Sequence, residues 1–465
     1  MAARPQAQTP PEAAAAAGPV RVPLGVILNY SGPTLGVGFM FFLVSLYMMP
    51  FATDVLLIAP GAMGTIFFAS RVWDAVSDPV AGYYSDRTHT RFGRRRPWMA
   101  GSVVPIAVVF IMMWSPPTAI GGGALVAWMA VGVLGFYTAM TVFIVPHTAL
   151  GAELTDAYHD RTRIFATRHV TWTLGSIVAV GGMQMLINAE QPRELAAIVS
   201  WSVAVVTGVL ILWAVRSLRE RPEFQGRGGQ NPLASFRDVW RNPHARILLV
   251  VFLIENLGAA TIGLLTFYIA KYVVKRPDLT GLFILCYMVA SIGFVPIWLP
   301  LSRRFGKKQL WIFSMLLTGA SFGGMFFLYE NSIVLISVLA VLGGTAASCG
   351  AMVGPSIQAD VIDYDEYLTG ERKEGAYFAA WNFVFKSATG VTIMLSGWVL
   401  QLVGFAPNQE QTETVKLAML SLYSIFPLVC YALGTVLFLT FKLDEKEHSR
   451  IRRELDARNA PASPS

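Results

Sequence analysis

A succession of long apolar segments constrains what this chain can fold into. Hydrophobic residues make up 54% of its 465 residues and charged residues 14%, whereas charged residues make up roughly 25% of an ordinary soluble chain. A helix needs about 18 consecutive, mostly apolar residues to cross the hydrocarbon core of a bilayer, and several segments here are longer. The sequence therefore predicts an all-α integral membrane protein with about twelve transmembrane helices.

Polar and basic segments separate the apolar stretches and so define the expected spans, whose ends such patterns place to within about 2–4 residues. The first six are Leu24–Met48, Ala62–Ser85, Trp98–Met113, Gly123–Thr148, Arg168–Ile187 and Ile198–Val215. The last six are Ala245–Tyr272, Leu279–Leu301, Gln309–Tyr329, Ile333–Gln358, Phe378–Leu402 and Lys416–Phe441. The chain then divides into a disordered N-terminal tail (1–23), a six-helix half (24–215), a cytoplasmic linker (216–244), a second six-helix half (245–441) and a C-terminal tail (442–465), in which we expect Ala457–Ser465 to be disordered.

Basic residues indicate the orientation, because loops rich in Lys and Arg stay on the cytoplasmic side. They concentrate after spans two, four and eight and in the linker, at Arg87, Arg91, Arg94, Arg95, Arg96, Arg161, Arg163, Arg219, Arg221, Arg303, Arg304, Lys307 and Lys308. We therefore expect a multi-pass protein of the inner (plasma) membrane with both termini cytoplasmic. Lys271, Lys275 and Arg276 after span seven are the main exception. This sorting explains the net charge of +7, so no nucleic-acid partner is expected.

The two halves repeat a pattern of charged motifs. The motif Gly82-Tyr-Tyr-Ser-Asp-Arg87 closes span two, and Leu301-Ser-Arg-Arg-Phe-Gly-Lys-Lys308 closes span eight, the equivalent position in the second half. Likewise, the acidic segments Ala152–Asp156 and Ala359–Asp363 follow spans four and ten. Repeated six-helix halves are typical of major facilitator transporters, whose substrate site lies near the midplane between the halves. We expect the protein to be a monomer.

Asp74 and Asp78 lie one helical turn apart within the second span. Side chains at i and i+4 share one helix face, and ionisable groups at bilayer depth usually mark ion or substrate pathways. Oxygen ligands suit Na⁺, and two neighbouring carboxylates disfavour double ionisation, which would allow proton coupling. The alternative is that Asp78 caps the turn before Pro79 or pairs with Arg71. The pair indicates transport of a solute driven by a cation.

Four motifs carry a family resemblance: Trp73-Asp-Ala-Val-Ser-Asp-Pro79, Arg91-Phe-Gly-Arg-Arg-Arg-Pro-Trp98, Val145-Pro-His-Thr-Ala-Leu-Gly-Ala-Glu-Leu154 and Ala359-Asp-Val-Ile-Asp-Tyr-Asp-Glu-Tyr367. Over roughly residues 24–441, the chain resembles the glycoside–pentoside–hexuronide:cation symporters of the major facilitator superfamily, the family of melibiose permease. The resemblance implies secondary symport of a small-molecule sugar, glycoside or related organic solute with Na⁺ or H⁺ by alternating access, and no cofactor beyond the coupling ion. An enzyme is not indicated, because the sequence shows no nucleophile–base or metal constellation, and the lack of a Walker motif disfavours an ATP-driven pump.

The resemblance also assigns roles to individual residues. It places Asp74 and Asp78 in the cation site with the hydroxyl of Thr141, which could instead bond to its own helix. It aligns Lys386 with a lysine that links the cation and substrate sites, so Asp74 or Asp78 is its expected partner; the alternative is a lysine that reaches an interface. Arg168 corresponds to an arginine near the sugar, or is an ordinary basic residue at the cytoplasmic boundary.

The chain departs from the family at two acidic positions that bind sugar hydroxyls. Gly38 in span one and Ile144 in span four stand where melibiose permease has aspartates. A pocket without these acceptors cannot hold a sugar in the same way, so groups such as Asn29, Trp381 or Asn382 must replace them if the substrate is a sugar. The alternative substrate is a lysolipid or another amphipathic or aromatic anion, with a basic residue of the site pairing with its charge.

Charged residues at the cytoplasmic ends of the spans are expected to gate the transporter. Asp86 and Arg94 follow span two, and Asp360, Asp363 and Arg372 follow span ten. These groups could pair across the interface between the halves in one conformation and separate in the other. The alternative is that they are solvated charges that only set the topology.

Overall fold

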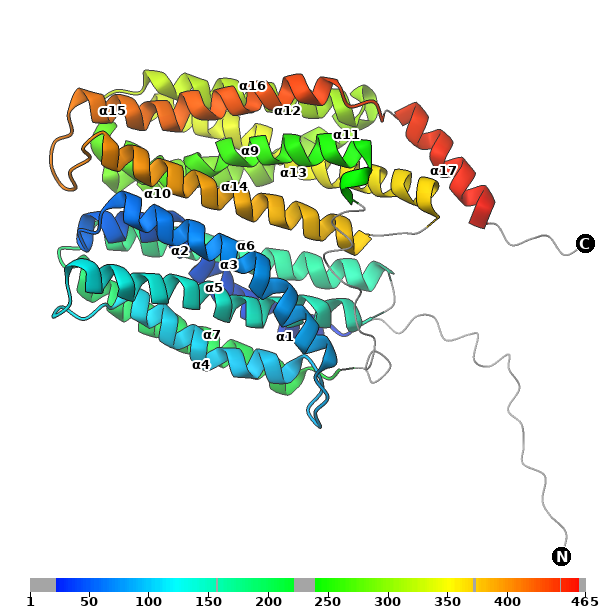
Figure 1. Ribbon diagram of the computed structural model, residues 1–465, viewed down its shortest axis with the longest axis horizontal. Helices are drawn as coiled ribbons and strands as arrows, with labels where there is room; N and C mark the ends of the chain where they lie inside the picture. Colours follow the sequence, from blue (N-terminus) through cyan, green and yellow to red (C-terminus); the bar gives the residue numbers. More distant parts are fainter. Residues whose placement is uncertain (1–21, 156–157, 221–238, 371–373, 444, 460–465) are drawn as a thin grey trace, which may run out of the picture.

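The computed structural model describes residues 22–155, 158–220, 239–370, 374–443 and 445–459. Within these residues all regular structure is helical, and the helices run along one axis in two groups (Figure 1). Helices α1–α7 form one group and α9–α16 form the other. The start of α1 and the last helix, α17, lie at the same end of the bundle, which we call the terminal end; the other is the opposite end.

The first group contains α1 (Leu24–Ser31), α2 (Pro33–Pro50), α3 (Pro60–Arg87), α4 (Arg96–Trp114), α5 (Gly122–Glu153), α6 (Tyr158–Ile187) and α7 (Pro192–Ser217). The second contains α9 (Pro243–Tyr268), α10 (Thr280–Gly293), α11 (Val295–Phe305), α12 (Lys307–Gly324), α13 (Ile333–Thr369), α14 (Glu374–Leu402), α15 (Glu413–Leu420) and α16 (Phe426–Leu439), and α17 (Glu445–Asn459) follows. Short π-helical turns continue α2, α9 and α15 as η2 (Phe51–Val55), η4 (Ile269–Val273) and η7 (Ser421–Ile425). The 3₁₀ turns are η5 (Pro277–Leu279) and η6 (Met325–Phe327).

These helices make twelve membrane spans. Eleven helical segments of the described residues are long and apolar enough to cross a bilayer, and α3 is the twelfth, although its charged residues make it more polar than the others. The predicted all-α fold with twelve transmembrane helices is confirmed. Spans one and eight each consist of two helices, because Pro33 and Pro296 stand at the start of α2 and α11, where a proline interrupts the preceding helix.

One expectation about the end of a helix is wrong. α13 does not stop at the predicted end of span ten, because Ala359–Thr369 continue it, so Asp360 and Asp363 lie on a helix instead of in a loop. The helix continues because Val361 is buried against other helices of the second half. It ends at Gly370, whose φ of +73° is the left-handed conformation that glycine favours.

Two other segments are also more helical than the sequence indicated. α6 begins at Tyr158, well before the predicted start at Arg168. The C-terminal tail contains α17, so the predicted disorder from Ala457 is wrong for the residues up to Asn459. Apolar residues of α17 are buried against α13, which explains its order. Residues 1–21 and 460–465, which are predicted to be disordered, lie outside the described residues, as does most of the linker.

The two groups make their most extensive contact where α3 crosses α14. Glycines allow this approach: a Cβ at Gly397 would lie 2.4 Å from the carbonyl oxygen of Pro60, and one at Gly64 would lie 2.9 Å from that of Ile393. A side chain at either position would push the helices apart, as at other membrane helix contacts built on small residues. The close approach brings Lys386 of α14 next to the acids of α3.

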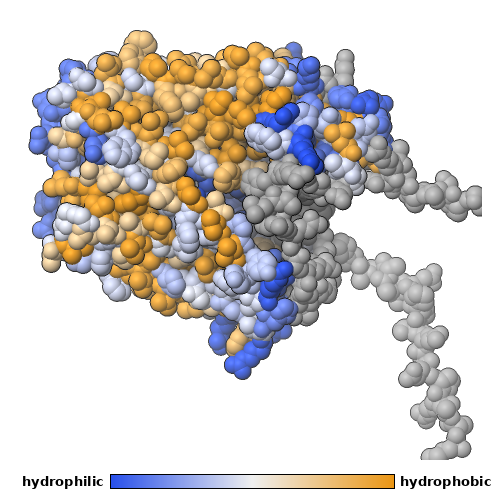
Figure 2. All heavy atoms as spheres, viewed as in Figure 1, coloured by the Kyte–Doolittle hydropathy of each residue, from blue (hydrophilic) through white to orange (hydrophobic). Residues whose placement is uncertain are grey.

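The outer surface suits a lipid environment. Figure 2 shows hydrophobic side chains over the middle of the face in view, with hydrophilic side chains gathered towards the ends of the bundle. Exposed large apolar residues include Val104, Val131, Trp201, Val205 and Trp213. Such a continuous apolar surface would be unfavourable in water and matches the hydrocarbon core of a bilayer.

Candidate functional site

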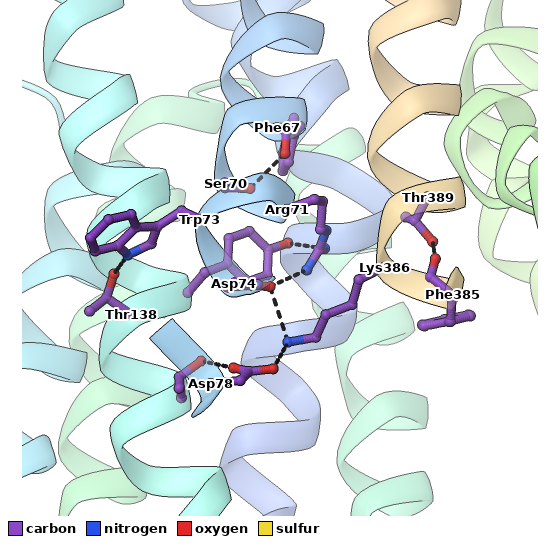
Figure 3. A network of polar contacts seen from close by, with 12 residues as sticks. Phe67, Ser70, Arg71, Trp73, Asp74, Asp78, Thr138, Phe385, Lys386 and Thr389 are labelled. Carbon is purple, nitrogen blue, oxygen red and sulfur yellow. Dashed lines mark hydrogen bonds and ion pairs between the residues drawn. The ribbon is translucent and has the colours of Figure 1, made fainter. Parts of the chain in front are cut away.

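Arg71, Asp74 and Asp78 of α3 form a compact cluster that faces α14 (Figure 3). Arg71 Nη1 lies 3.3 Å from Asp74 Oδ2, and Arg71 Nη2 donates a 2.7 Å hydrogen bond to the hydroxyl of Tyr137 on α5. Only 2% of the Asp74 side chain is exposed, whereas 34% of the Asp78 side chain is exposed. The two acids share one helix face, but Asp78 is the one that a solute ion can reach first.

Lys386 connects the second half to these acids. Its Nζ lies 2.5 Å from Asp78 Oδ2 and 3.3 Å from Asp74 Oδ2 (Figure 3). The structure therefore brings Lys386 to both of its expected partners rather than to a membrane interface. Thr141 on α5 donates a 2.7 Å hydrogen bond to Asp78 Oδ1 instead of bonding to its own helix. Arg71 pairs with Asp74, not with Asp78.

The cluster has the donor atoms that a small cation requires. Hard cations bind oxygen ligands, and the two carboxylates and the Thr141 hydroxyl supply them. Asp74 Oδ1 is buried and accepts no hydrogen bond from the described residues. A buried acceptor without a donor is unfavourable, and a cation at this oxygen would remove that cost. The residues present therefore fit Na⁺ or a proton as the co-transported ion.

Two adjoining cavities lie next to the cluster. The larger has a volume of about 430 Å³ and is lined by residues of α9, α10, α12, α13, α14 and α16, among them Trp381 and Asn382. The smaller has a volume of about 250 Å³, lies between the two halves and is lined in part by Arg71. Asn256 and Phe385 line both cavities. The smaller cavity therefore borders the charged cluster at Arg71 and meets the larger cavity at Asn256 and Phe385.

Asn29 and Arg168 line neither of these cavities. Asn29 Oδ1 accepts a 3.1 Å hydrogen bond from Trp213 Nε1 of α7 in an exposed environment, so its side chain points to a neighbouring helix. The carbonyl of Arg168 accepts a hydrogen bond from the Thr34 hydroxyl, and its guanidinium Nε is buried without a partner among the described residues. The structure does not bring either residue together with Trp381 and Asn382.

Gly38 is a packing residue between α2 and α6. A Cβ at Gly38 would lie 2.6 Å from the carbonyl oxygen of Trp172, so an aspartate would not fit there without moving a helix. Ile144 packs against the same apolar core. The close packing of α2 on α6 therefore leaves no room for a side chain at Gly38 in this conformation.

Several polar residues that line the larger cavity were not predicted from the sequence, among them Glu255, Trp311 and Gln358. The signal for Glu255 was present, because an acid inside an apolar span is a functional candidate by default. Trp311 and Gln358 belong to segments that read as ordinary spans, and only the packing of α12 and α13 around one cavity distinguishes them.

A polar cluster joins the two halves at the opposite end. Asp54 of η2 accepts hydrogen bonds from Lys271 Nζ of η4 at 2.5 Å and from the Tyr272 hydroxyl at 2.8 Å. Asn408 donates a 2.6 Å hydrogen bond to the main-chain carbonyl of Asp54. These contacts close the bundle at this end, and they explain why a basic residue follows span seven.

The other two basic residues after span seven also pair with acids. Lys275 Nζ lies 3.2 Å from Glu330 Oε2 and 3.2 Å from Glu410 Oε1, and Arg276 pairs with Asp278 at 2.7 Å. The hydrogen bond from Lys275 lowers the pKa of the Glu410 carboxyl. Nearby acids therefore balance the charges of the basic residues after span seven, which depart from the expected distribution of Lys and Arg.

The predicted gating residues of the first half pair within that half. Asp86 of α3 forms an ion pair with Arg95, and Arg94 Nη2 lies 2.7 Å from Glu153 Oε1 of α5. The carboxylate of Glu220 accepts hydrogen bonds from the main-chain amides of residues 94–96. These contacts hold the segment between α3 and α4 against the terminal end of the first half.

The predicted gating residues of the second half form a matching cluster. Lys307 Nζ lies 2.7 Å from Asp360 Oδ2, and His448 Nε2 of α17 lies 3.1 Å from Asp363 Oδ2. Arg372 lies outside the described residues. In this conformation α17 is therefore tied to the terminal end of α13 within the same half.

Comparisons with known proteins agree with this architecture. The MFS/sugar transport protein family matches residues 29–445. The isoprimeverose transporter of Lactiplantibacillus pentosus is 27% identical over 92% of this chain and 90% of its own. The sodium-dependent lysophosphatidylcholine symporter 1 of Xenopus tropicalis is 24% identical over 88% of this chain and 85% of its own.

A solved structure of the nucleoside transporter NupG superposes with a TM-score of 0.64 at 13% identity, covering 90% of this chain and 100% of that one, which shows a shared fold. The resemblance to the glycoside–pentoside–hexuronide:cation symporters is confirmed at the level of the symporter family. With the family match spanning nearly all of the helical bundle, the chain belongs to the MFS/sugar transport protein family and is a membrane transporter rather than an enzyme.

Proposed function

We propose that the protein moves a sugar, glycoside or related organic solute together with Na⁺ or H⁺, with Asp74, Asp78 and Thr141 holding the ion. The observation that carries this proposal is the ion-pair cluster with Lys386, which joins α3 to α14 beside the cavities. A cation at the carboxylates and a solute in the cavities would both contact the interface that must rearrange during transport. A relative named as an isoprimeverose transporter supports a sugar-like solute.

Lys386 offers a physical route from the cation to the solute. Its ammonium lies 2.5 Å from Asp78, where a bound cation would also lie, and like charges at such distances repel strongly. Cation binding should therefore release Lys386 from Asp78. The same helix carries Trp381, Asn382 and Phe385 in the cavity walls, so the release would change the solute site. Each ligand then favours the conformation that the other binds best.

The proposed cycle assigns a conformation to the structure. The opposite end is closed by Asp54 and Lys271, while Asp86 and Asp360 pair within their own halves at the terminal end. This arrangement corresponds to a state open towards the terminal end. In the alternate state the Asp54 ion pair separates, and the charged groups at the terminal end meet across the interface.

We infer that the protein lies in the inner (plasma) membrane. Its terminal end is on the cytoplasmic side, because the basic loops collect there. Thr90 and Gln409 are exposed at the two ends and allow a test in a background in which the native cysteines are replaced by Ser. In intact cells a membrane-impermeant thiol reagent should label Gln409→Cys and spare Thr90→Cys, and both should react after permeabilisation. Labelling of Thr90→Cys alone in intact cells would show that the protein has the opposite orientation.

The solute class can be tested by thermal unfolding of the purified protein. Methyl glucosides, galactosides and xylosides should raise the midpoint of unfolding, and more so with Na⁺ or at lower pH, because a ligand that binds only the folded state stabilises it. The second candidate is an amphipathic solute with an anionic group, such as the phosphate of a lysolipid, favoured by the apolar walls of the smaller cavity around Arg71 and by a relative named as a lysophosphatidylcholine symporter. Stabilisation by lysophosphatidylcholine and by none of the glycosides would select this second candidate.

A further inference from the structure

Glu255 is a buried carboxyl group with a single hydrogen-bond partner. It lies midway along α9 and is 9% exposed, and its Oε1 accepts a 3.2 Å hydrogen bond from the indole Nε1 of Trp311 on α12. Among the described residues, its second oxygen has no donor and no basic side chain pairs with it. A buried carboxyl group is unfavourable unless donors or a cation compensate it.

The second oxygen of Glu255 faces the larger cavity. Glu255 lines this cavity, and α16 lies close behind it, since a Cβ at Gly434 would lie 3.7 Å from Glu255 Cγ. Unlike Asp74 Oδ1, the free oxygen of Glu255 is not enclosed by protein atoms. Of the described residues that line this cavity, Glu255 is the only Asp, Glu, Lys or Arg. A ligand in the cavity would therefore meet one carboxyl oxygen that still needs a donor.

The other walls supply uncharged polar groups and aromatic rings. Gln358 of α13 is buried, lines the cavity and makes no hydrogen bond to the described residues. Asn256 uses its Nδ2 in a 2.6 Å hydrogen bond to the carbonyl of Phe252, which leaves its Oδ1 as an acceptor. The rings of Tyr287 and Trp381 complete the surface. In a pocket with largely apolar walls, a small number of polar groups fixes the orientation of a small ligand.

This chemistry selects one class of ligand. Hydroxyl groups can donate to a carboxyl oxygen or an amide oxygen and can accept from an amide nitrogen. The apolar faces of a sugar ring can pack on aromatic rings. The cavity therefore fits an uncharged solute with several hydroxyl groups.

We propose that Glu255 binds a hydroxyl group of a neutral, polyhydroxylated substrate and determines specificity in a subsite of the second half. This inference rests on the proposed symport of a sugar-like solute and names where part of that solute binds. Glu255 then supplies, from α9, an acceptor that Gly38 and Ile144 do not supply from the first half. Trp311 is a positioning residue, because its indole holds the carboxyl group in place.

Glu255→Gln is the matched variant for a test. Its carboxamide has the same shape and its oxygen can still accept from Trp311, so the fold should be kept. Glu330→Gln is the control, because Glu330 is exposed at the opposite end. Affinities and uptake rates are measured for methyl glucoside, galactoside and xyloside and for each of their monodeoxy derivatives.

We expect Glu255→Gln to raise the KM for the glycoside that the wild type prefers by about twofold to tenfold, the usual size of one net hydrogen bond, with a smaller change in the maximal rate. One monodeoxy derivative should bind the wild type more weakly by a similar factor. That derivative should bind Glu255→Gln no more weakly than the parent glycoside does. Only direct contact between this hydroxyl and Glu255 produces that pattern.

Three results would overturn the inference. Equal affinities of the wild type and Glu255→Gln for every glycoside would exclude the contact, while cation-dependent uptake by the wild type would leave the proposed symport intact. Unchanged affinities with a lost dependence of uptake on pH would make Glu255 a proton site instead. Binding of lysophosphatidylcholine by the wild type without binding of any glycoside would overturn the sugar-like substrate and this subsite together.

Discussion

Asp78→Asn is expected to abolish accumulation of the solute against its gradient. The carboxamide keeps the shape of the side chain and can still accept a hydrogen bond from Thr141, but it removes the charge that holds a cation and Lys386. Without cation coupling the internal concentration should only equilibrate with the external one. Uptake of a labelled glycoside into membrane vesicles under an imposed Na⁺ or H⁺ gradient measures the effect.

Asp74→Asn should give the same loss of accumulation and a larger loss of stability. Asp74 is nearly fully buried between Arg71 and Lys386, and removing one partner of a buried ion pair costs up to about 3–5 kcal/mol. The unfolding temperature of the purified variant reports this cost separately from transport.

Exchange without a cation gradient separates coupling from folding. Both Asn variants should still exchange labelled for unlabelled solute, because the cavity walls are unchanged. Asp278→Asn is the matched control, since Asp278 is exposed and pairs with Arg276 away from the cavities, and it should accumulate solute like the wild type. Accumulation at the wild-type level by Asp78→Asn would place the cation site elsewhere.

Lys271→Met should open the opposite end of the transporter. The side chain of Asp54 is 5% exposed and that of Lys271 is 24% exposed, so losing the pair should destabilise the closed state by about 1–2 kcal/mol after allowance for solvent screening. That is roughly a five- to thirtyfold shift in population. Ser45 lines the smaller cavity, and Ser45→Cys in the Cys-free background should react faster by a similar factor with an impermeant thiol reagent added from the opposite side.

Two further variants test whether the charge pair causes this effect. Exchanging the charges, with Asp54→Lys and Lys271→Asp combined, should restore part of the slow labelling, because opposite charges again face each other. Lys275→Met is the control: Lys275 pairs only with exposed acids and should leave the rate near that of the parent. A labelling rate that Lys271→Met does not change would mean that other contacts hold this end closed.

Much of the fold followed from the sequence because a bilayer permits few solutions. Each backbone group in hydrocarbon needs an internal partner, so a long apolar segment in a protein of this class must be a helix. The same constraint made the charged residues of the spans informative. The spacing of Asp74 and Asp78 places both on one helix face, and a lysine within a span, such as Lys386, favours an acid nearby, which the structure shows at 2.5 Å.

Helix ends and helix neighbours were harder to infer. Residues 359–369 read as a polar loop, yet they remain helical because other elements of the second half cover their apolar side. Asn29 was a candidate for the substrate site, but its side chain bonds to Trp213 on α7. Such outcomes depend on which helix packs beside which, and local sequence patterns do not contain that information.

The membrane class, the helical content, the two-half architecture and the residues most costly to bury can be inferred from the amino-acid sequence, because each of these follows from local composition and the solvent. Which groups meet depends on how the helices pack. Asp54 and Lys271 are 217 positions apart in the chain, and Glu255 of span seven meets Trp311 of span nine. At Gly38, the backbone of α6 occupies the space that a side chain would need. Side-chain partners across helices are set by the packing of whole helices, and that packing is a property of the complete fold.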